Sequence, residues 1–237
     1  MSKLSDGTKR RIVICITVVS IVLMIVVFYL KKQYDNLGNI KTYNNNYLVY
    51  TKKSNDKGHY YKNVPYLNIK SEVAKAINEN ISAFLEEYLD DDNVAISYEY
   101  DLSGDILSLV IKVTDYNTNY APEIYFKSFN YNIKDESLVS DLKLLELFNT
   151  DESFVESVIE SKFQDYYNEE VEEGYFDERE CDYNCFLGYR EVENYLDNVT
   201  YYVKNGKLVA FKPFIFSSIY GEEEFFTDEH FKFVITK

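Results

Sequence analysis

The chain has 237 residues, of which 46% are hydrophobic, and it includes 24 Tyr and 16 Phe but only 8 Gly and 3 Pro. This composition argues against a disordered or low-complexity protein, and the length is enough for a membrane anchor and one sizeable domain. The net charge of −15 is uneven, since residues 1–32 carry +5 and the remainder therefore carries −20. Such acidity argues against nucleic acid as a partner and attracts basic proteins, although solubility alone explains it equally well.

The first predicted element is an apolar helix. Residues 12–30 read IVICITVVSIVLMIVVFYL, without a charge or a proline. At about 1.5 Å per residue this run spans roughly 28 Å, close to the hydrocarbon thickness of a bilayer. It lacks the small-residue cleavage site of a signal peptide. We predict a short cytoplasmic head at 1–11, a single-pass transmembrane anchor at 12–30, a linker at 31–46 and an extracytoplasmic domain at 47–237 in the cell membrane.

The domain opens with strands that lead into a helix. Extended segments are expected at 47–51 and 59–69, and Pro65 indicates that its strand lies at a sheet edge or ends there. Ser71 is expected to cap the helix that follows. Helical spacing gives this helix one buried stripe of Val73, Ile77, Ile81, Phe84 and Tyr88. For Asn78 we favour a buried amide that bonds main chain at the strand–helix junction over a ligand contact.

Alternating apolar residues then predict a meander of strands. Residues 96–113 are expected to form a hairpin that turns at Leu102–Asp105. A further strand is expected at 123–133, with Tyr125, Phe129, Tyr131 and Ile133 on one face.

The last third of the chain mixes helices and strands. A short helix or turn is expected at 138–148, and Thr150 is expected to cap a longer helix. That helix has a predicted core face of Phe154, Val155, Val158, Ile159, Phe163 and Tyr166. Asn205-Gly206 predicts a hairpin with a type I′ turn, and a final strand closes the chain. Without regular βαβ alternation, the pattern predicts an α+β fold with a largely antiparallel sheet and packed helices.

Several stretches occur in an order that resembles a known extracytoplasmic module of Gram-positive bacteria. They read VPYLNIKSEVAKAINENI, ISYEYDLSGDILSLVIKVTDY, FNYNIKDESLVSDLKLLELF and YYVKNGKLVAFKPFIFSSIYGEEEFF. They are similar to the outer region of lysozyme-sensing anti-sigma factors of the RsiV type and to the non-catalytic domain of PdaC-type peptidoglycan deacetylases. Much of this wider family consists of domains of unknown function.

The chain also departs from both relatives. Residues 1–11 are too short to hold a sigma factor, and the deacetylase domain is missing. The only histidines are His59 and His230, so no metal-binding histidine pair at helical spacing exists. The resemblance therefore implies the anchored module alone, and it transfers no ligand-contact residues to this chain.

Cys181 and Cys185 lie in the acidic stretch CDYNC. In a helical turn this spacing brings the two Cα atoms to about 6 Å, within reach of a disulfide. We favour a structural disulfide, with two free thiols as the alternative. A redox or metal role is disfavoured, because the spacing is not C-x-x-C and no second ligand pair follows.

Runs of acidic residues are frequent, but none has the glycine and alternating oxygens of a calcium loop. They are Asp90–Asp92, Glu169–Glu173, Asp177–Asp182 and Glu222–Glu224. We expect most of them to be solvated faces. Glu222, Glu223 and Glu224 are candidate partner contacts, because they follow the late hairpin in a loop and loops often carry contacts.

No catalytic residues, cofactor or metal site are predicted, and we expect the protein not to be an enzyme. The leading hypothesis is a membrane-anchored extracytoplasmic module that binds peptidoglycan or a basic wall-degrading enzyme such as lysozyme. The alternatives are a cell-envelope hydrolase with an unrecognised carboxylate site and a purely structural envelope protein.

Overall fold

The computed structural model describes residues 15, 18–25, 40–43, 47–53, 60–117, 122–177, 179–215 and 231–235. The chain divides into two compact units, Met1–Lys41 and Thr42–Lys237. In the first unit, residues 15 and 18–25 are helical and their side chains are exposed. None of the helices in the described residues is long and apolar enough to cross a membrane. Most of the predicted anchor, 12–30, lies outside those residues.

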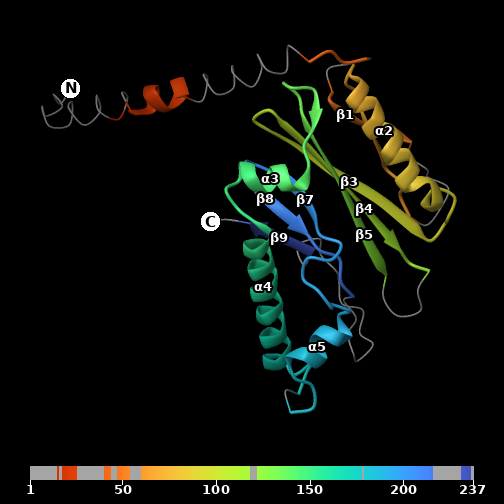
Figure 1. Ribbon diagram of the computed structural model, residues 1–237, viewed down its shortest axis with the longest axis vertical. Helices are drawn as coiled ribbons and strands as arrows, with labels where there is room; N and C mark the ends of the chain where they lie inside the picture. The colour runs from red at the N-terminus through yellow and green to blue at the C-terminus, as the bar shows by residue number, and fades with distance from the viewer. Residues whose placement is uncertain are drawn as a thin grey trace, which may run out of the picture. The chain divides into compact units, whose positions relative to one another are not determined.

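The described part of the second unit contains three antiparallel sheets (Figure 1). The first pairs β1 (Val49–Lys53) with β2 (Val64–Leu67). The second has the order β3 (Val94–Ser103), β4 (Ile106–Asp115), β5 (Glu123–Asn132) and β6 (Ser137–Leu138). The third has the order β7 (Thr200–Lys204), β8 (Lys207–Phe211) and β9 (Lys232–Ile235). The predicted α+β fold with antiparallel strands is confirmed, but the strands are divided among several sheets.

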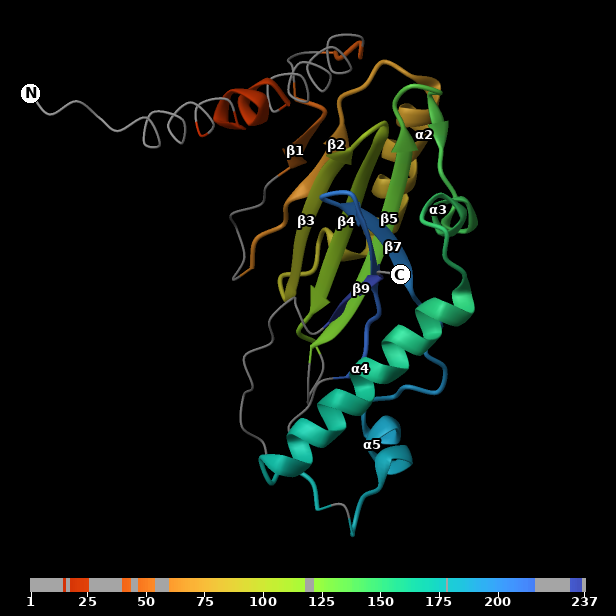
Figure 2. The same ribbon diagram turned by 90° about the vertical axis from the view of Figure 1, so that its left-hand side faces the viewer.

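The helices of this unit cover the sheets from two sides. They are α2 (Glu72–Leu85), the 3₁₀ turn η1 (Glu86–Tyr88), α3 (Asp141–Leu147), α4 (Glu152–Glu172) and α5 (Tyr183–Tyr189). In Figure 2, α2 lies behind the β3–β6 sheet and the β7–β9 sheet lies in front of it. α4 then packs on the far side of the β7–β9 sheet. The unit is therefore layered as helix, sheet, sheet and helix.

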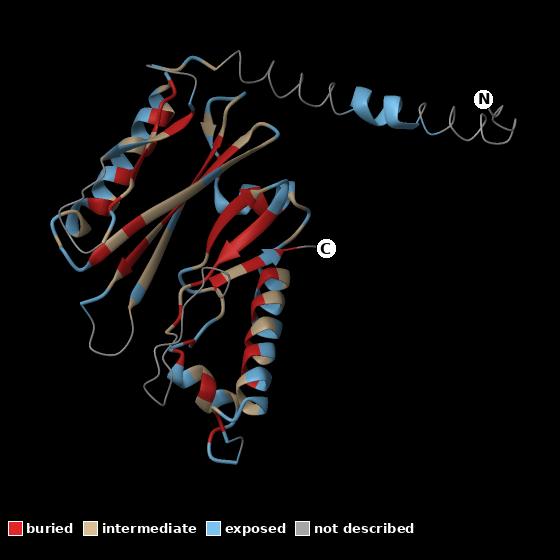
Figure 3. Ribbon diagram, turned by 180° about the vertical axis from the view of Figure 1, so that it is seen from behind, coloured by how far each residue is buried: buried red, intermediate tan, exposed pale blue. Residues whose placement is uncertain are grey.

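Strands β7 and β8 are buried on both faces along most of their length, as Figure 3 shows in red, whereas Val234 of the edge strand β9 is exposed. On one face Tyr202, Val209 and Phe211 pack against Val110 of β4. The opposite face packs against α4 and α5 through Tyr201, Val203, Leu208, Ala210, Phe233 and Ile235. Side chains alternate between the two faces of a strand, so a strand buried on both sides is apolar at nearly every position.

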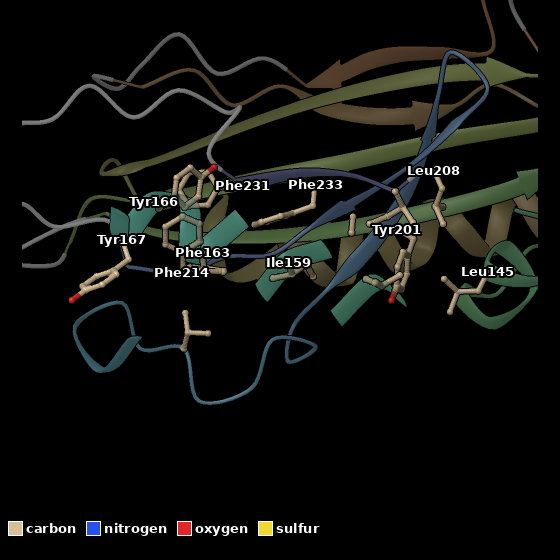
Figure 4. Packing of buried hydrophobic residues seen from close by; sticks show 14 of the residues in the cluster. Leu145, Ile159, Phe163, Tyr166, Tyr167, Tyr201, Leu208, Phe214, Phe231 and Phe233 are labelled. Carbon is tan, nitrogen blue, oxygen red and sulfur yellow. The ribbon is translucent and has the colours of Figure 1, made fainter. Parts of the chain in front are cut away.

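Aromatic rings fill the core between α4 and the β7–β9 sheet (Figure 4). The centroid of Phe163 lies 4.8 Å from that of Phe214, and Phe214 lies 5.0 Å from Phe231. The predicted core face of α4 is confirmed, although Phe154 and Val158 are only partly buried. The predicted cap at Thr150 is wrong. Asp151 caps the helix instead, since its carboxylate accepts from the N–H of Phe154 at 2.9 Å.

The start of α2 matches the sequence expectation. The hydroxyl of Ser71 accepts from the N–H groups of Val73 and Ala74. Asn78 holds the main chain of Leu67 in β2 from both sides: its Oδ1 accepts from the N–H at 2.8 Å and its Nδ2 donates to the carbonyl at 2.9 Å. The expected bonding of Asn78 to main chain at the strand–helix junction is thus confirmed, although the residue is half-buried rather than buried.

The buried stripe of α2 is rotated slightly from the predicted one. Its buried residues are Ala74, Ile77, Ile81 and Leu85. Val73, Phe84 and Tyr88 are only half-buried and lie beside this stripe.

Both predicted hairpins are present. β3 and β4 pair in register from Val94 with Asp115 to Ser103 with Ile106. The other hairpin, of β7 and β8, turns at Asn205 and Gly206 with φ angles of 52° and 73°. Positive φ at both central residues is the type I′ geometry that the Asn-Gly pair indicates.

Polar side chains join the two larger sheets. The outer edge of β7 lies against the β3–β6 sheet, where the N–H of Val203 donates to Ser108 Oγ at 3.0 Å. The carbonyl of Tyr201 accepts from Asn130 Nδ2 at 2.9 Å. Ser108 and Asn130 also bond each other. Buried backbone groups at this sheet edge are therefore satisfied by side chains of the neighbouring sheet.

Candidate functional site

Three surface features of the second unit could serve a function: an acidic region on α4, a stacked pair of tyrosines, and a cleft beside β5. The acidic region is the most extended of them. Residues 151–182 contain thirteen Asp or Glu and two Lys or Arg. The carboxylates on exposed positions of α4 are Glu152, Glu156, Glu160, Asp165, Glu169 and Glu172.

Apart from Glu152, which lies favourably in the first turn, these carboxylates are placed where they do not stabilise the helix that carries them. Glu152, Glu156 and Glu160 follow one another at a spacing of four residues, where like charges repel. Glu169 and Glu172 lie in the last turns, where the partial charge of the helix is already negative, and no basic residue lies in the last turn. The charge is thus concentrated where it costs helix stability.

A short helix beside this region is held by a disulfide. Cys181 and Cys185 are bonded, with their Cα atoms 5.2 Å apart. The carboxylate of Asp182 caps α5 by accepting from the N–H of Cys185 at 2.9 Å. The carbonyl of Cys181 accepts from the Tyr167 hydroxyl at 3.1 Å, and Phe186 fixes α5 in the core. This arrangement is structural, because the disulfide closes a single turn at the start of α5 and the Tyr167 hydroxyl bond joins that turn to α4.

The second feature is a stacked pair of tyrosines. The rings of Tyr60 and Tyr116 lie 4.1 Å apart and within 5° of parallel, and 39% of Tyr116 is exposed. Polar groups surround it: the N–H of Tyr116 donates to the carbonyl of Asn93, and Asn117 Nδ2 donates to Asp91 at 2.6 Å. The Asn93 N–H and then the Asn117 amide hold the pKa of Asp91 below its usual value. An aromatic face beside amides and a carboxylate is suited to binding a sugar ring.

The third feature is an open cleft of about 500 Å³ that we call the β5 cleft. It runs along the first half of β5 and is lined by segments far apart in the sequence: Phe84, Pro122–Lys127, Asp141, Arg190–Glu191, Asn198–Thr200 and Pro213–Ile215. Arg190 supports its wall, since the N–H of Ile215 donates to the Arg190 carbonyl at 3.1 Å. The Arg190 guanidinium is itself buried, pairs with Glu170 and lies over the ring of Phe186.

One rim of the β5 cleft is aromatic. Tyr88 lies 6.0 Å from Phe84 and 5.9 Å from Tyr125, and the Tyr125 hydroxyl donates to Glu123. Burial, followed by the carboxylate of Glu87, raises the pKa of Tyr88 to about 12. The hydrogen bond to Glu123, followed by burial, raises the pKa of Tyr125. Both hydroxyls therefore remain neutral hydrogen-bonding groups at physiological pH.

The predicted site residues are only partly placed by the structure. Cys181 and Cys185 come together, whereas Glu222, Glu223 and Glu224 lie outside the described residues. So do His59 and His230. Within the described ranges, no group of three or more His, Cys, Asp or Glu side chains is placed to hold a metal ion.

The sequence showed the acidic runs around α4, but it gave no signal for the stacked tyrosines or the β5 cleft.

Comparison with known proteins adds no identification. No protein-family model matches the chain, and no curated protein is similar to it.

Proposed function

We propose that the chain is a single-pass, membrane-anchored binding module whose acidic domain lies outside the cytoplasm. Its partner is a basic, wall-degrading enzyme such as lysozyme. The observation that supports this proposal is the excess of carboxylates in residues 151–182, on and after α4. The resemblance to lysozyme-sensing extracytoplasmic modules supports the same class of partner.

These charges repel one another until a partner neutralises them. Like charges along α4 destabilise the helix, and a basic surface laid against it removes that cost. A domain with −20 outside residues 1–32 also steers a basic protein toward itself during diffusion. The screening length falls from about 10 Å at 0.1 M salt to about 3 Å at 1 M, so this steering depends on salt.

Surface plasmon resonance of the 33–237 fragment with lysozyme tests the proposal. We expect the association rate to fall as salt rises, while the dissociation rate changes less. Neutralising α4 with Glu156→Gln, Glu169→Gln and Glu172→Gln should lower the association rate severalfold at low salt.

The control has the same change in net charge on α2 and the turn after it: Glu79→Gln, Glu86→Gln and Asp90→Asn, all at exposed positions. It should have a smaller effect than the α4 variant. If both variants slow association equally, net charge alone matters and α4 is not the contact surface. If a folded fragment binds no lysozyme at any salt concentration, lysozyme is excluded as a partner.

Peptidoglycan is the second candidate partner, and the stacked pair of Tyr60 and Tyr116 favours it. Sedimentation of the fragment with purified peptidoglycan measures this binding. Tyr116→Ala removes the ring face and should abolish co-sedimentation, whereas Tyr116→Phe keeps the ring and should retain it. Equal retention by both variants would exclude the stacked pair as the sugar site.

The proposed location has its own test. Protease added to intact protoplasts should remove an epitope placed after Lys237. A protected epitope would show that the domain lies inside the cell, whatever it binds.

A further inference from the structure

The first half of β5 has an open edge in the described part of the chain. β4 pairs with β5 along its whole length, whereas β6 pairs only with Tyr131 and Asn132. Residues Glu123–Lys127 therefore have a strand on one side and the β5 cleft on the other.

Two hydrogen bonds identify the backbone groups that point to this edge. The N–H of Ser128 donates to Thr200 Oγ1 at 3.2 Å, and the carbonyl of Asn130 accepts from the N–H of Val139 at 2.7 Å. Backbone groups of an antiparallel strand alternate between its two edges. Ile124 and Phe126 therefore direct both their N–H and their carbonyl toward the β5 cleft. At this edge neither residue has a backbone hydrogen bond with any described residue.

The walls of the β5 cleft suit the side chains of an added strand. On the α2 side, Tyr125 contacts Tyr88, with ring centroids 5.9 Å apart. On the side of the β7–β9 sheet, Phe126 contacts Phe211 at 4.9 Å, and Phe214 also lines the cleft. Side chains of a strand alternate between its two faces. One face of a segment placed here would meet Phe126 and Phe214, and the other would meet Tyr125 beside the carboxylate of Glu123.

The charges of the cleft indicate a basic ligand. The Arg190 guanidinium is paired with Glu170. Desolvation raises the pKa of Asp141, and the nearby charge of Lys127 partly opposes this effect. The cleft lining holds the acidic residues Glu123, Asp141 and Glu191 against the basic residues Lys127 and Arg190. Because Arg190 is already neutralised by Glu170, the lining carries a net negative charge. A second copy of the chain would bring another strongly acidic domain to the same place and would be repelled.

We propose that the β5 cleft binds an extended, basic peptide segment of a partner protein, which adds to the β3–β6 sheet as a further strand beside Glu123–Lys127. Main-chain hydrogen bonds to Ile124 and Phe126 give the affinity, and alternating side chains give the specificity. The site extends beyond the proposed function, because it needs neither the acidic surface of α4 nor a location outside the cell.

Residue-resolved hydrogen exchange on the full chain in detergent tests the proposal. The probe is a capped six-residue peptide of alternating valine and lysine. In the free chain, the amides of Ile124 and Phe126 should exchange rapidly, whereas those of Tyr125 and Lys127, which face β4, should exchange slowly. Saturating peptide should slow the amides of Ile124 and Phe126 at least tenfold.

Two altered peptides keep the protein itself unchanged. Methylation of alternate peptide nitrogens removes donors from the edge that faces β5, and it should weaken binding about tenfold or more. A peptide of alternating valine and glutamate should also bind more weakly than the lysine peptide.

The protein variant Glu123→Gln with Glu191→Gln should bind the lysine peptide less well, while Glu79→Gln with Glu86→Gln should bind it normally.

Three outcomes would overturn the proposal. Slow exchange of Ile124 and Phe126 in the free chain would mean that the chain itself covers the edge. Protection that increases with protein concentration would mean that a second copy occupies it. Peptide binding that leaves both amides unprotected would place the peptide elsewhere. None of these outcomes bears on lysozyme binding at α4, so the two proposals can fail separately.

Discussion

The main-chain N–H of Val203 donates a hydrogen bond of 3.0 Å to the side chain of Ser108, 95 residues earlier in the chain. Both residues are buried, and Ser108 also bonds Asn130 of the adjacent strand. Backbone groups at the β7 edge of the β7–β9 sheet are therefore hydrogen-bonded by side chains of the β3–β6 sheet rather than by a further strand.

Ser108→Ala should lower the free energy of unfolding by about 1–3 kcal/mol, because the N–H of Val203 is then left buried without an acceptor. Urea unfolding measures this change. The control is Ser97→Ala on β3, whose half-buried hydroxyl has no hydrogen bond to any described residue. Equal effects of the two substitutions would contradict the importance of this bond.

Removing the carboxylate that pairs with Arg190 should be costly. The side chains of Arg190 and Glu170 are 3% and 13% exposed, so Glu170→Gln leaves a buried charge without its counter-ion. A loss of about 3 kcal/mol is expected. The exposed pair of Lys143 and Glu146 gives the contrast, since Glu146→Gln should change stability by at most about 0.5 kcal/mol. Denaturant unfolding of both variants measures these changes in the free energy of unfolding. A similarly small loss in both variants would refute the prediction.

Cys181 and Cys185 should be paired in protein isolated from cells without reductant. Mass spectrometry after alkylation checks this, and modification of both thiols would contradict it. The bond closes a very short loop, so replacing both residues by Ser should cost only about 2 kcal/mol and leave the domain folded. A native circular dichroism spectrum of the double variant is the expected result.

Alkaline pH should destabilise the domain in part through Tyr201. Burial, followed by the carboxylates of Asp141 and Glu152, raises its pKa from 10.0 to about 12. Because the pKa of Tyr201 is higher in the folded than in the unfolded state, the folded domain favours the neutral phenol. The resulting contribution to the free energy of unfolding is present in full below pH 10 and is lost as the pH rises toward 12. The Tyr201→Phe variant lacks this ionisable hydroxyl. Its free energy of unfolding should therefore fall less between pH 10 and 12 than the free energy of unfolding of the unaltered chain. Parallel pH profiles would show that Tyr201 does not contribute.

Local features of the fold could be predicted from the sequence because a few neighbouring residues determine them. Such short stretches determine the turn at Asn205-Gly206, the helix cap at Ser71 and the pair of hydrogen bonds from Asn78 to the main chain of Leu67. The cap of α4 was misplaced by one residue, because Thr150 and Asp151 are both good caps and only the structure shows which side chain reaches the helix.

Long-range features could not be predicted in this way. The division of the strands into separate sheets depends on contacts such as the one between Asn130 and Tyr201, which no local pattern records. The β5 cleft is assembled from Phe84, Arg190, Phe214 and other residues of distant segments, each of which reads alone as an ordinary core or surface residue. The acidity around α4 and its exposure could be predicted, because a helix with one core face leaves its carboxylates on the solvated side.

The contacts between the two larger sheets also have a consequence for folding kinetics. Strands β3–β5 form a local meander, but one of their faces is covered only when the β7–β8 hairpin, about a hundred residues later, has been synthesised. Closing contacts across so long a loop is slow, because its entropy is lost before the contacts form. Until then, Val110, Ser108 and Asn130 lie on an uncovered sheet face. A chain that stops before residue 200 should therefore remain sensitive to protease, and one that continues through β9 should become resistant.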